Sequence, residues 1–310
     1  MVGRRQGATF KARGPALLLM GGGADVVEGF REAHRLLAAG RGGRSADVVV
    51  LRTSGENGYD AFLHQEAPFA SVQTLLLSPE AGPKDLARAA ERVRGAHFVF
   101  FAGGDQAEYV RWAGTPLADA VRDVYARGGA VGGTSAGGAI LGQVAFDSLQ
   151  ARTRNVTTAE ALQNPLAERL SFTQDMFAFL PNVLTDTHFE QRDRFGRLVA
   201  FLANRQLTHG AAPLGIGVDP ATALVVNDRR SAVLMKSPDR SGSAYVVELK
   251  EIHRPAPLRA TVAVHRLSQG GQTYDLGARR GTGDRYDITV DGAQEEPYSA
   301  NPYVTDRSRG

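Results

Sequence analysis

A glycine-rich stretch from Gly128 to Gly142 constrains this chain most, because it surrounds one serine with residues that have almost no side chain. It reads Gly-Gly-Ala-Val-Gly-Gly-Thr-Ser-Ala-Gly-Gly-Ala-Ile-Leu-Gly, with Ser135 at its centre. A short apolar run ends at the glycines, and small and aliphatic residues at helical spacing follow the serine. This pattern predicts a strand, a tight turn and a helix, with Ser135 at the tip of the turn. Gly133 and Gly137 would let the two arms of the turn pass closely.

Such a turn indicates a nucleophile. A serine held in a strained conformation above a sheet exposes its hydroxyl, and the helix beginning at Ala136 directs its unpaired N–H groups to the same place. An oxyanion formed during acyl transfer would develop there, so the turn predicts half of an oxyanion hole as well. The alternative is coincidence, because a chain with 36 glycines can contain G-x-S-x-G by chance.

Composition narrows the class of protein. The chain has 310 residues, 43% hydrophobic and 22% charged, which fits one large α/β domain or one domain with an appendage. No apolar run approaches the roughly 20 residues that a membrane-spanning helix needs. The net charge is only +3 and the basic residues are scattered, so neither a nucleic-acid nor a membrane partner is expected. The absence of cysteine excludes disulfides, cysteine–zinc sites and a cysteine nucleophile.

The basic N-terminus is followed by an apolar run, 16–20, that is too short for the core of a signal peptide. We therefore expect a flexible leader at 1–13 and a cytoplasmic location, with secretion possible only if further residues precede this N-terminus.

The first half of the chain alternates apolar runs with segments of helical periodicity. The expected strands are 15–20, 46–51, 71–77, 97–101 and the run before Ser135, and the expected helices are 26–39, 84–94 and 117–127. Buried runs separated by amphipathic helices predict a mostly parallel, doubly wound α/β sheet with helices on both faces. Ligands bind at the carboxyl ends of such strands, so the loops after them should share one rim. These loops are 21–23, 52–58, 103–106 and 134–136.

The second half is less regular. We expect a loop-rich excursion at 146–180 with a short helix at 158–162, then a short strand, a polar loop around His188 and a helix at 191–203. The strands expected after this helix are 216–218, 223–226, 232–235, 244–249, 260–267, 274–276 and 286–290. The predicted organisation is a catalytic core at 14–228, a C-terminal antiparallel β extension of the same domain at 229–293, and a poorly ordered polar tail at 294–310.

A serine nucleophile needs a base, and the base needs a group that holds its tautomer. Of the seven histidines, His188 is the best candidate, because it lies in a polar loop after a short strand and follows Ser135 along the chain, as in α/β serine hydrolases. The alternative is a histidine that merely caps the next helix. Asp147, Glu160 and Asp186 all lie at plausible places for the acid, and spacing does not choose among them.

Several segments, in this order, resemble those of cyanophycinases and their relatives in the peptidase E-type family of serine peptidases. They are Gly103-Gly104-Asp105-Gln106, then Gly133-Thr134-Ser135-Ala136-Gly137, then Asp186-Thr187-His188-Phe189 with Gln191-Arg192 and Gly196-Arg197-Leu198. Residues 215–219, 222–225, 265–267 and 274–276 also look like family segments, so the resemblance runs from about residue 16 to residue 280.

The resemblance implies a class I glutamine amidotransferase-like fold, no cofactor, no metal and a homodimer. It assigns Ser135 as nucleophile, His188 as base, and the backbone N–H groups of Ala136 and of Gly103 or Gly104 as oxyanion donors. The acid of the family lies between the serine and the histidine, and the segment ending at Glu160 looks like the one that carries it. The resemblance therefore favours Glu160, with Asp147 as second choice.

The resemblance further implies a peptide-like substrate with aspartyl groups. Cyanophycinases hydrolyse multi-L-arginyl-poly-L-aspartate to β-aspartyl-arginine, and such a substrate needs arginines for its carboxylates and acids for its guanidinium groups. The residues expected at the substrate site are Asp105, Gln106, Asp186, Thr187, Arg192 and Arg197. Cyanophycinases typically have glutamine before their histidine, where this chain has Thr187.

Three other functions are alternatives to a cyanophycinase. A peptidase E-like aspartyl dipeptidase would share the chemistry but not the substrate, and an inactive binding protein would share only the fold. A nucleotide-binding module is disfavoured, because residues 21–26 do not match G-x-G-x-x-G and no Walker A lysine pattern is present.

Overall fold

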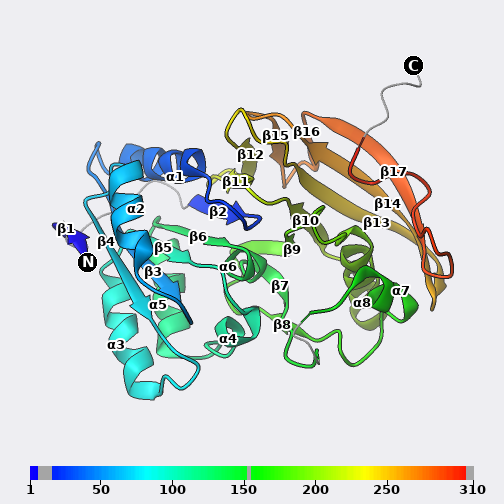
Figure 1. The fold of residues 1–310 in the computed structure, drawn as a ribbon, viewed down its shortest axis with the longest axis horizontal. Helices are drawn as coiled ribbons and strands as arrows, with labels where there is room; N and C mark the ends of the chain where they lie inside the picture. Colours follow the sequence, from blue (N-terminus) through cyan, green and yellow to red (C-terminus); the bar gives the residue numbers. More distant parts are fainter. Residues whose placement is uncertain (6–15, 152–154, 305–310) are drawn as a thin grey trace.

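Two β-sheets carry the structure, which is a computed structural model that describes residues 1–5, 16–151 and 155–304 (Figure 1). Within these ranges the first sheet has ten strands in the order β1-β4-β3-β5-β6-β2-β11-β12-β15-β16. The strands from β4 to β2 are parallel, and those from β11 onward pair antiparallel. Their bounds are β1 Val2–Gly3, β2 Ala16–Met20, β3 Asp47–Arg52, β4 Ser71–Leu76, β5 Phe98–Phe101, β6 Ala130–Thr134, β11 Ala223–Val226, β12 Ser231–Met235, β15 Thr273–Asp275 and β16 Arg280–Gly281.

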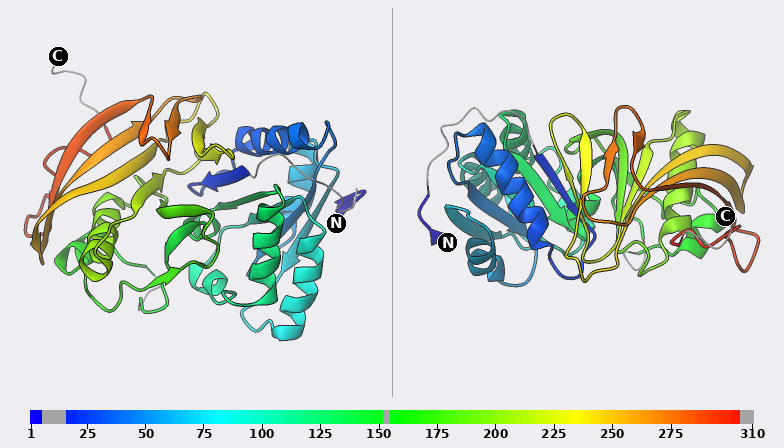
Figure 2. Two further views of the ribbon diagram at one scale, coloured as in Figure 1. Left: turned by 180° about the vertical axis from the view of Figure 1, so that it is seen from behind. Right: turned by 90° about the horizontal axis from the view of Figure 1, so that it is seen from above.

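The second sheet, described within the same ranges, has seven strands in the order β17-β14-β13-β10-β9-β7-β8. Its strands β7, β9 and β10 are parallel, and β8, β13, β14 and β17 pair antiparallel. The long strands β13, β14 and β17 lie at the end of the molecule opposite the N-terminus (Figure 2). The bounds are β7 Gly142–Phe146, β8 Phe172–Gln174, β9 Leu180–Thr187, β10 Leu214–Val218, β13 Ala244–Pro255, β14 Leu258–Leu267 and β17 Asp284–Asp291.

Helices cover both faces of the first sheet, and its central strands β2, β5 and β6 are buried at every position. In β2, Leu17 and Leu19 face the core that includes α3 and α5, whereas Leu18 and Met20 face the core that includes α1 and α2. This alternation is what a parallel sheet buried on both sides requires. The helices are α1 Val27–Gly40, α2 Gly58–Glu66, α3 Pro83–Arg94, α4 Gln106–Val110, α5 Pro116–Ala126, α6 Ala136–Ala139, α7 Thr158–Gln163 and α8 Phe195–His209.

The second sheet has its own core, built around α8. Side chains of α8 such as Leu198 and Phe201 are fully buried against the second sheet, and Phe146 of β7 stacks on Phe201 with ring centroids 4.7 Å apart. None of the helices in the described part of the chain is long and apolar enough to cross a membrane. The predicted fold class, a mostly parallel α/β sheet with a C-terminal antiparallel extension, is confirmed.

Three local expectations are corrected. The helix after His188 begins at Phe195 rather than at residue 191, because residues 188–194 form a turn in which the Arg194 N–H bonds to the Phe189 carbonyl at 2.9 Å. In the leader, the first residues add strand β1 to the edge of the first sheet, and the remainder lies outside the described residues. In the tail, Tyr303 packs against the protein with 8% of its surface exposed. The predicted domain boundaries stay a prediction.

The glycines of the serine turn generate a stability prediction. A Cβ on Gly137 would lie 2.3 Å from the Phe101 carbonyl oxygen, a backbone atom that cannot move away easily. We expect Gly137→Ala to lower the free energy of unfolding by about 1–3 kcal/mol in urea denaturation, the usual cost of overpacking. The matched control is Gly58→Ala, because a Cβ at Gly58 meets nothing within 4 Å. Equal stability of the two variants would contradict the close packing of the turn.

Candidate active site

Ser135 lies at the carboxyl end of β6 in a strained backbone conformation. Its φ is 53° and its ψ is −122°, in a region that side-chain-bearing residues rarely adopt. The turn is fixed by a hydrogen bond from the Ser135 N–H to the Met20 carbonyl at 3.1 Å. A Cβ on Gly133 would lie 2.2 Å from the Gly137 carbonyl oxygen, so the two arms of the turn are as close as the sequence predicts. This is the geometry of a nucleophile elbow.

His188 reaches Ser135 from the other sheet. The Ser135 Oγ and His188 Nε2 atoms are 2.9 Å apart, a hydrogen-bonding distance. His188 follows β9 with a φ of 48°, and its N–H donates to the Gly21 carbonyl at 2.7 Å. Gly22, the next residue along, leaves room for the ring, because a Cβ there would lie 2.3 Å from Nε2. The ends of β2, β6 and β9 therefore meet at one point, and two of the loops predicted to share a rim, 21–23 and 134–136, lie there.

The other nitrogen of His188 is held by an amide rather than a carboxylate. His188 Nδ1 lies 2.8 Å from Gln191 Oε1, and an amide oxygen accepts, so this contact places the proton on Nδ1. Nε2 is then left to accept from the Ser135 hydroxyl. Burial lowers the pKa of His188, aided by Arg192 and Arg194 and opposed by Gln191 and Asp186. The imidazole is therefore neutral near pH 7, as a general base must be.

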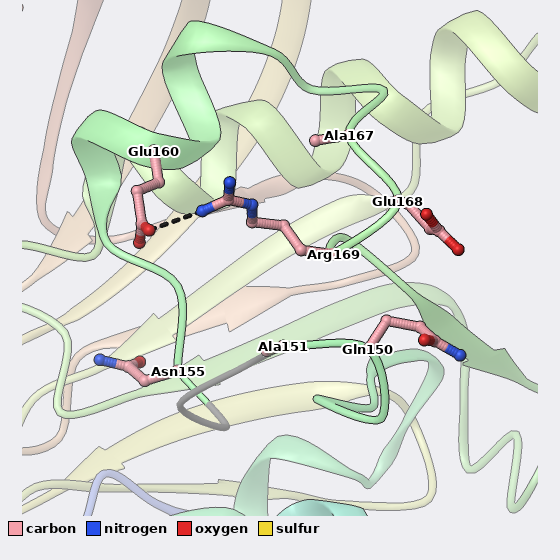
Figure 3. A pocket seen from close by; sticks show the side chains of 7 residues that line it. All are labelled: Gln150, Ala151, Asn155, Glu160, Ala167, Glu168 and Arg169. Atoms are coloured by element: carbon pink, nitrogen blue, oxygen red, sulfur yellow. Dashed lines mark hydrogen bonds and ion pairs between the residues drawn. The ribbon is translucent and has the colours of Figure 1, made fainter.

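The structure places the two predicted acids elsewhere. Glu160 accepts from the Thr157 N–H at 3.0 Å, which caps α7, and pairs with Arg169 at 2.6 Å (Figure 3). Asp147 is buried and accepts from Thr173 Oγ1 at 3.1 Å. In the described contacts neither carboxylate reaches His188, so the geometry does not support Glu160 or Asp147 as its partner.

Gln191 was not predicted from the sequence as the partner of His188, for two reasons. It is not an acid, and the segment that contains it was expected to be helical. The only available signal was its place three residues after His188, in a segment that the family resemblance had already marked.

The oxyanion prediction is compatible with the backbone. Ala136 is the first residue of α6, and a Cβ on Gly103 would lie 3.6 Å from the Ser135 Cβ, so the backbone at Gly103 passes beside the nucleophile. Gly104 has a φ of 159°, and it lines the same cavity as Ser135 and Ala136. The assignment of these N–H groups as oxyanion donors stays a prediction.

A cavity of about 400 Å³ opens beside the serine. Four of the residues predicted to contact substrate line it, together with Asn155 and Arg194. The complete lining is Gly104, Asp105, Gln106, Ser135, Ala136, Asn155, Thr187, Arg192 and Arg194. Asp105 also caps α4, because its carboxylate accepts from the Ala107 N–H at 2.9 Å. The described lining thus carries two guanidinium groups against one carboxylate, which favours an anionic group in the ligand.

The remaining two predicted substrate residues, Asp186 and Arg197, lie behind the cavity wall. Arg197 contacts the Asp186 carboxylate through Nε at 2.9 Å and through Nη2 at 2.6 Å. Arg194 adds a contact at 3.3 Å and donates to the Thr187 carbonyl at 2.7 Å. Burial acts to raise the pKa of Asp186, but Arg197 and Arg194 hold it below its ordinary value. Asp186 and Arg197 therefore support the site, whereas Arg194, which sequence reasoning missed, faces it.

Among the described residues, the lining of a neighbouring cavity of about 560 Å³ includes no serine or threonine. This cavity is lined by Gln150, Ala151, Asn155, Glu160, Ala167, Glu168 and Arg169, so Asn155 borders both cavities (Figure 3). Within the described residues, no cluster of three or more His, Cys, Asp or Glu side chains could hold a metal ion.

No protein-family model matches this chain. It is 25% identical over 225 residues to a cyanophycinase of Geminocystis herdmanii, covering 68% of this chain and 73% of that protein. It is 26% identical over 230 residues to a cyanophycinase of Trichormus variabilis, covering 70% and 69%. It is 27% identical over 248 residues to a cyanophycinase of Synechococcus elongatus, covering 76% and 69%.

A solved structure shares the fold. The crystal structure of a peptidase from an acI-B1 Actinobacterium has a TM-score of 0.57 and 16% identity, covering 86% of this chain and 98% of that one. The sequence similarity covers more than two thirds of this chain and of each relative. The chain is therefore similar in sequence to cyanophycinases and in fold to a peptidase, and these similarities support a serine-type peptidase.

Proposed function

We propose that this protein is an exopeptidase of the cyanophycinase type, which hydrolyses multi-L-arginyl-poly-L-aspartate to β-aspartyl-arginine through an acyl-enzyme. The observation that supports this proposal best is the contact of 2.9 Å between Ser135 Oγ and His188 Nε2 beside a cavity lined by Arg192 and Arg194. The first feature supplies the chemistry and the second selects an anionic substrate. The sequence relatives are cyanophycinases, which agrees with both features.

The proposed reaction has two steps. Ser135 Oγ attacks the carbonyl carbon while His188 Nε2 takes the hydroxyl proton, and the oxyanion lies near the N–H groups of Ala136 and Gly103 or Gly104. His188 then gives that proton to the departing amine, which leaves an ester on Ser135. In the second step His188 takes a proton from water, the resulting hydroxide attacks the ester, and the proton returns to Ser135.

The proposed group that orients the base is Gln191. Its amide oxygen can fix the ring and the tautomer of His188, but as a neutral group it stabilises the imidazolium less than a carboxylate does. A neutral partner is consistent with the lowered pKa of His188, because an amide opposes the effect of burial less than a carboxylate would. The constellation of Ser135, His188 and Gln191 is therefore a variant of a catalytic triad in which an amide replaces the acid.

One observation favours a second candidate function. Thr187 lines the cavity, at the position where cyanophycinases typically carry glutamine. A shorter, branched side chain there would change which groups of a substrate are held, which fits a peptidase E-like aspartyl dipeptidase of other specificity. A homodimer, implied by the resemblance, stays a prediction that light scattering would check.

The nucleophile is tested by Ser135→Ala. We expect hydrolysis to fall by about 10⁶-fold, since the acyl-enzyme cannot form, while the fold is retained because a smaller side chain fits the turn. A fluorophosphonate should label the native protein and Ser54→Ala, which alters an exposed serine elsewhere at the rim, but not Ser135→Ala. Failure to label the native protein would favour an inactive binding protein.

The role of Gln191 is tested by the pH dependence of kcat/KM. Activity requires neutral His188, so it is lost as pH falls through the pKa of His188, and the lowered pKa places this acid limb below pH 6.5. In Gln191→Glu the new carboxylate should raise this pKa and move the limb to higher pH. Gln191→Ala should lower kcat at least about tenfold, because nothing orients the ring.

Glu160→Gln discriminates between Gln191 and Glu160 as the group that orients His188. We expect it to leave kcat nearly unchanged and to weaken only the cap of α7. A loss of orders of magnitude in Glu160→Gln, with little effect in Gln191→Ala, would make Glu160 the orienting acid after all.

The substrate is tested with cyanophycin and a panel of α- and β-aspartyl dipeptides, with the products identified by mass. Release of β-aspartyl-arginine would support the proposal, and cleavage of dipeptides alone would support the second candidate. Arg192→Ala should raise KM about 10- to 100-fold, because a charge-assisted hydrogen bond contributes about 1.5–3 kcal/mol. Arg192→Lys should rescue only in part, since an ammonium group cannot form a bidentate contact. Cleavage of none of these peptides would refute the aspartyl specificity.

A further inference from the structure

The chain beyond β17 folds back along that strand and does not extend away from the protein. The Asp291 N–H donates to the Pro297 carbonyl at 2.8 Å, and the Ser299 N–H donates to the Thr289 carbonyl at 2.9 Å. Tyr286, on β17, donates to the Pro302 carbonyl at 2.6 Å. These contacts carry residues 297–303, which we call the C-terminal strap, to the beginning of α8.

Two tyrosines of the strap bind the turn that precedes α8. The Tyr298 and Tyr303 hydroxyls donate to the same Asp193 carboxylate oxygen, at 2.6 and 2.8 Å. The Tyr303 hydroxyl also accepts from the Phe195 N–H at 3.0 Å, and the Tyr298 hydroxyl accepts from the Gly196 N–H at 3.2 Å. Each phenol thus serves as donor and acceptor at once, and each satisfies an N–H group in the first turn of a helix, where intrahelical partners are lacking.

The rings of the two tyrosines add apolar contacts to the same turn. Tyr303 packs edge-on against Phe195 and against Phe189, with ring centroids 6.2 and 6.1 Å apart. Phe189 directly follows the catalytic histidine along the chain. Such edge-on pairs stabilise a buried cluster beyond the area that they cover. The strap is therefore joined by hydrogen bonds and by packing to the turn at residues 188–194, which we call the catalytic turn.

The residue that the strap holds lies between the two arginines of the cavity. Asp193 has a φ of 43°, a left-handed conformation that needs support from its surroundings. Arg192 and Arg194 flank it and both line the cavity. His188, in contrast, has a second anchor on the other side, because its N–H donates to the Gly21 carbonyl at 2.7 Å. Loss of the strap should therefore disturb the arginines before it disturbs the serine and histidine.

We propose that Tyr298 and Tyr303 are positioning residues for substrate binding, acting through Asp193 to hold Arg192 and Arg194 toward the ligand's carboxylate. This proposal rests on the proposed function in one respect, the anionic group of the substrate. It assigns a role in substrate binding to the C-terminal strap, which contains none of the residues proposed to take part in the reaction.

The test compares two fluorophosphonates on the full-length protein, one with a neutral alkyl chain and one whose chain ends in a carboxylate. The ratio of their labelling rates at Ser135 reports on the arginines without requiring a known substrate. In the double variant Tyr298→Phe/Tyr303→Phe we expect this ratio to fall about tenfold, with the rate for the neutral probe nearly unchanged. Tyr286→Phe is the matched control, because it removes a phenol that binds the strap but has no hydrogen bond to Asp193 in the described structure.

A conservative exchange separates positioning from mere stability. Asp193→Asn keeps an oxygen that both phenols can bind, so it should retain more of the ratio than Asp193→Ala does. An unchanged ratio in the double tyrosine variant would overturn the proposal. An equal loss with both probes, together with a lowered Tm, would also overturn it, since that result describes a structural role only.

Hydrogen exchange provides a readout that does not depend on activity. Backbone amides of residues 192–197 should exchange at least about tenfold faster in the double variant than in the native protein or Tyr286→Phe, whereas those of β5 should not change. Failure of the native protein to react with either probe would refute the proposed function, and the exchange rates would still decide whether the strap holds the turn. Unaltered exchange at residues 192–197 would refute the proposal that the strap holds this turn.

Discussion

The hydrogen bond between Ser135 and His188 joins two sheets, and the candidate site depends on how closely these sheets approach. Ser135 comes from β6 of the first sheet and His188 from the end of β9 in the second. The two sheets are tied together nearby, where the Thr185 hydroxyl of β9 donates to the Gly138 carbonyl of α6 at 3.0 Å. Gly22 lies against the imidazole with no Cβ between them. Small residues at the turn are therefore a condition for the chemistry, because any larger side chain would separate nucleophile and base.

A second constraint is the buried charge behind the cavity. Asp186 is 2% exposed, and burying a lone carboxylate would cost several kcal/mol, so its two arginine partners are needed for it to stay ionised. The pair of Asp186 and Arg197 is internally neutral, which leaves Arg194 and Arg192 to set the charge of the cavity. Arg194, whose pKa burial lowers to about 10, remains protonated at neutral pH. The family resemblance identified the right segment, but two of its expected substrate residues, Asp186 and Arg197, contact each other behind the cavity wall.

The parts of the fold that follow from backbone periodicity could be predicted, and those that depend on side-chain direction could not. Apolar runs predicted the parallel strands of the first sheet to within a residue or two, because buried strands need continuous hydrophobic sequence, whereas β7 of the second sheet was not predicted. The glycines around Ser135 predicted its turn, since few conformations accommodate them. Gln191 and Arg194 could not be assigned, because the turn at 188–194 has left-handed residues at His188 and Asp193 that break the helical spacing expected there. Glu160 satisfied the spacing for an acid, but its carboxylate caps its own helix instead.

The C-terminal strap shows why composition alone misjudged the end of the chain. Its polar, proline-containing sequence is typical of a poorly ordered tail, yet two tyrosines and several hydrogen bonds to β17 hold it in place. A phenol offers a ring for packing and a hydroxyl that can donate and accept, so Tyr298 and Tyr303 satisfy both the Asp193 carboxylate and helix N–H groups. Phenylalanine would preserve the packing but leave those polar groups without their partners. The order of the segment therefore depends in part on the groups that it satisfies on the turn before α8, and these groups lie about 100 residues away in the chain.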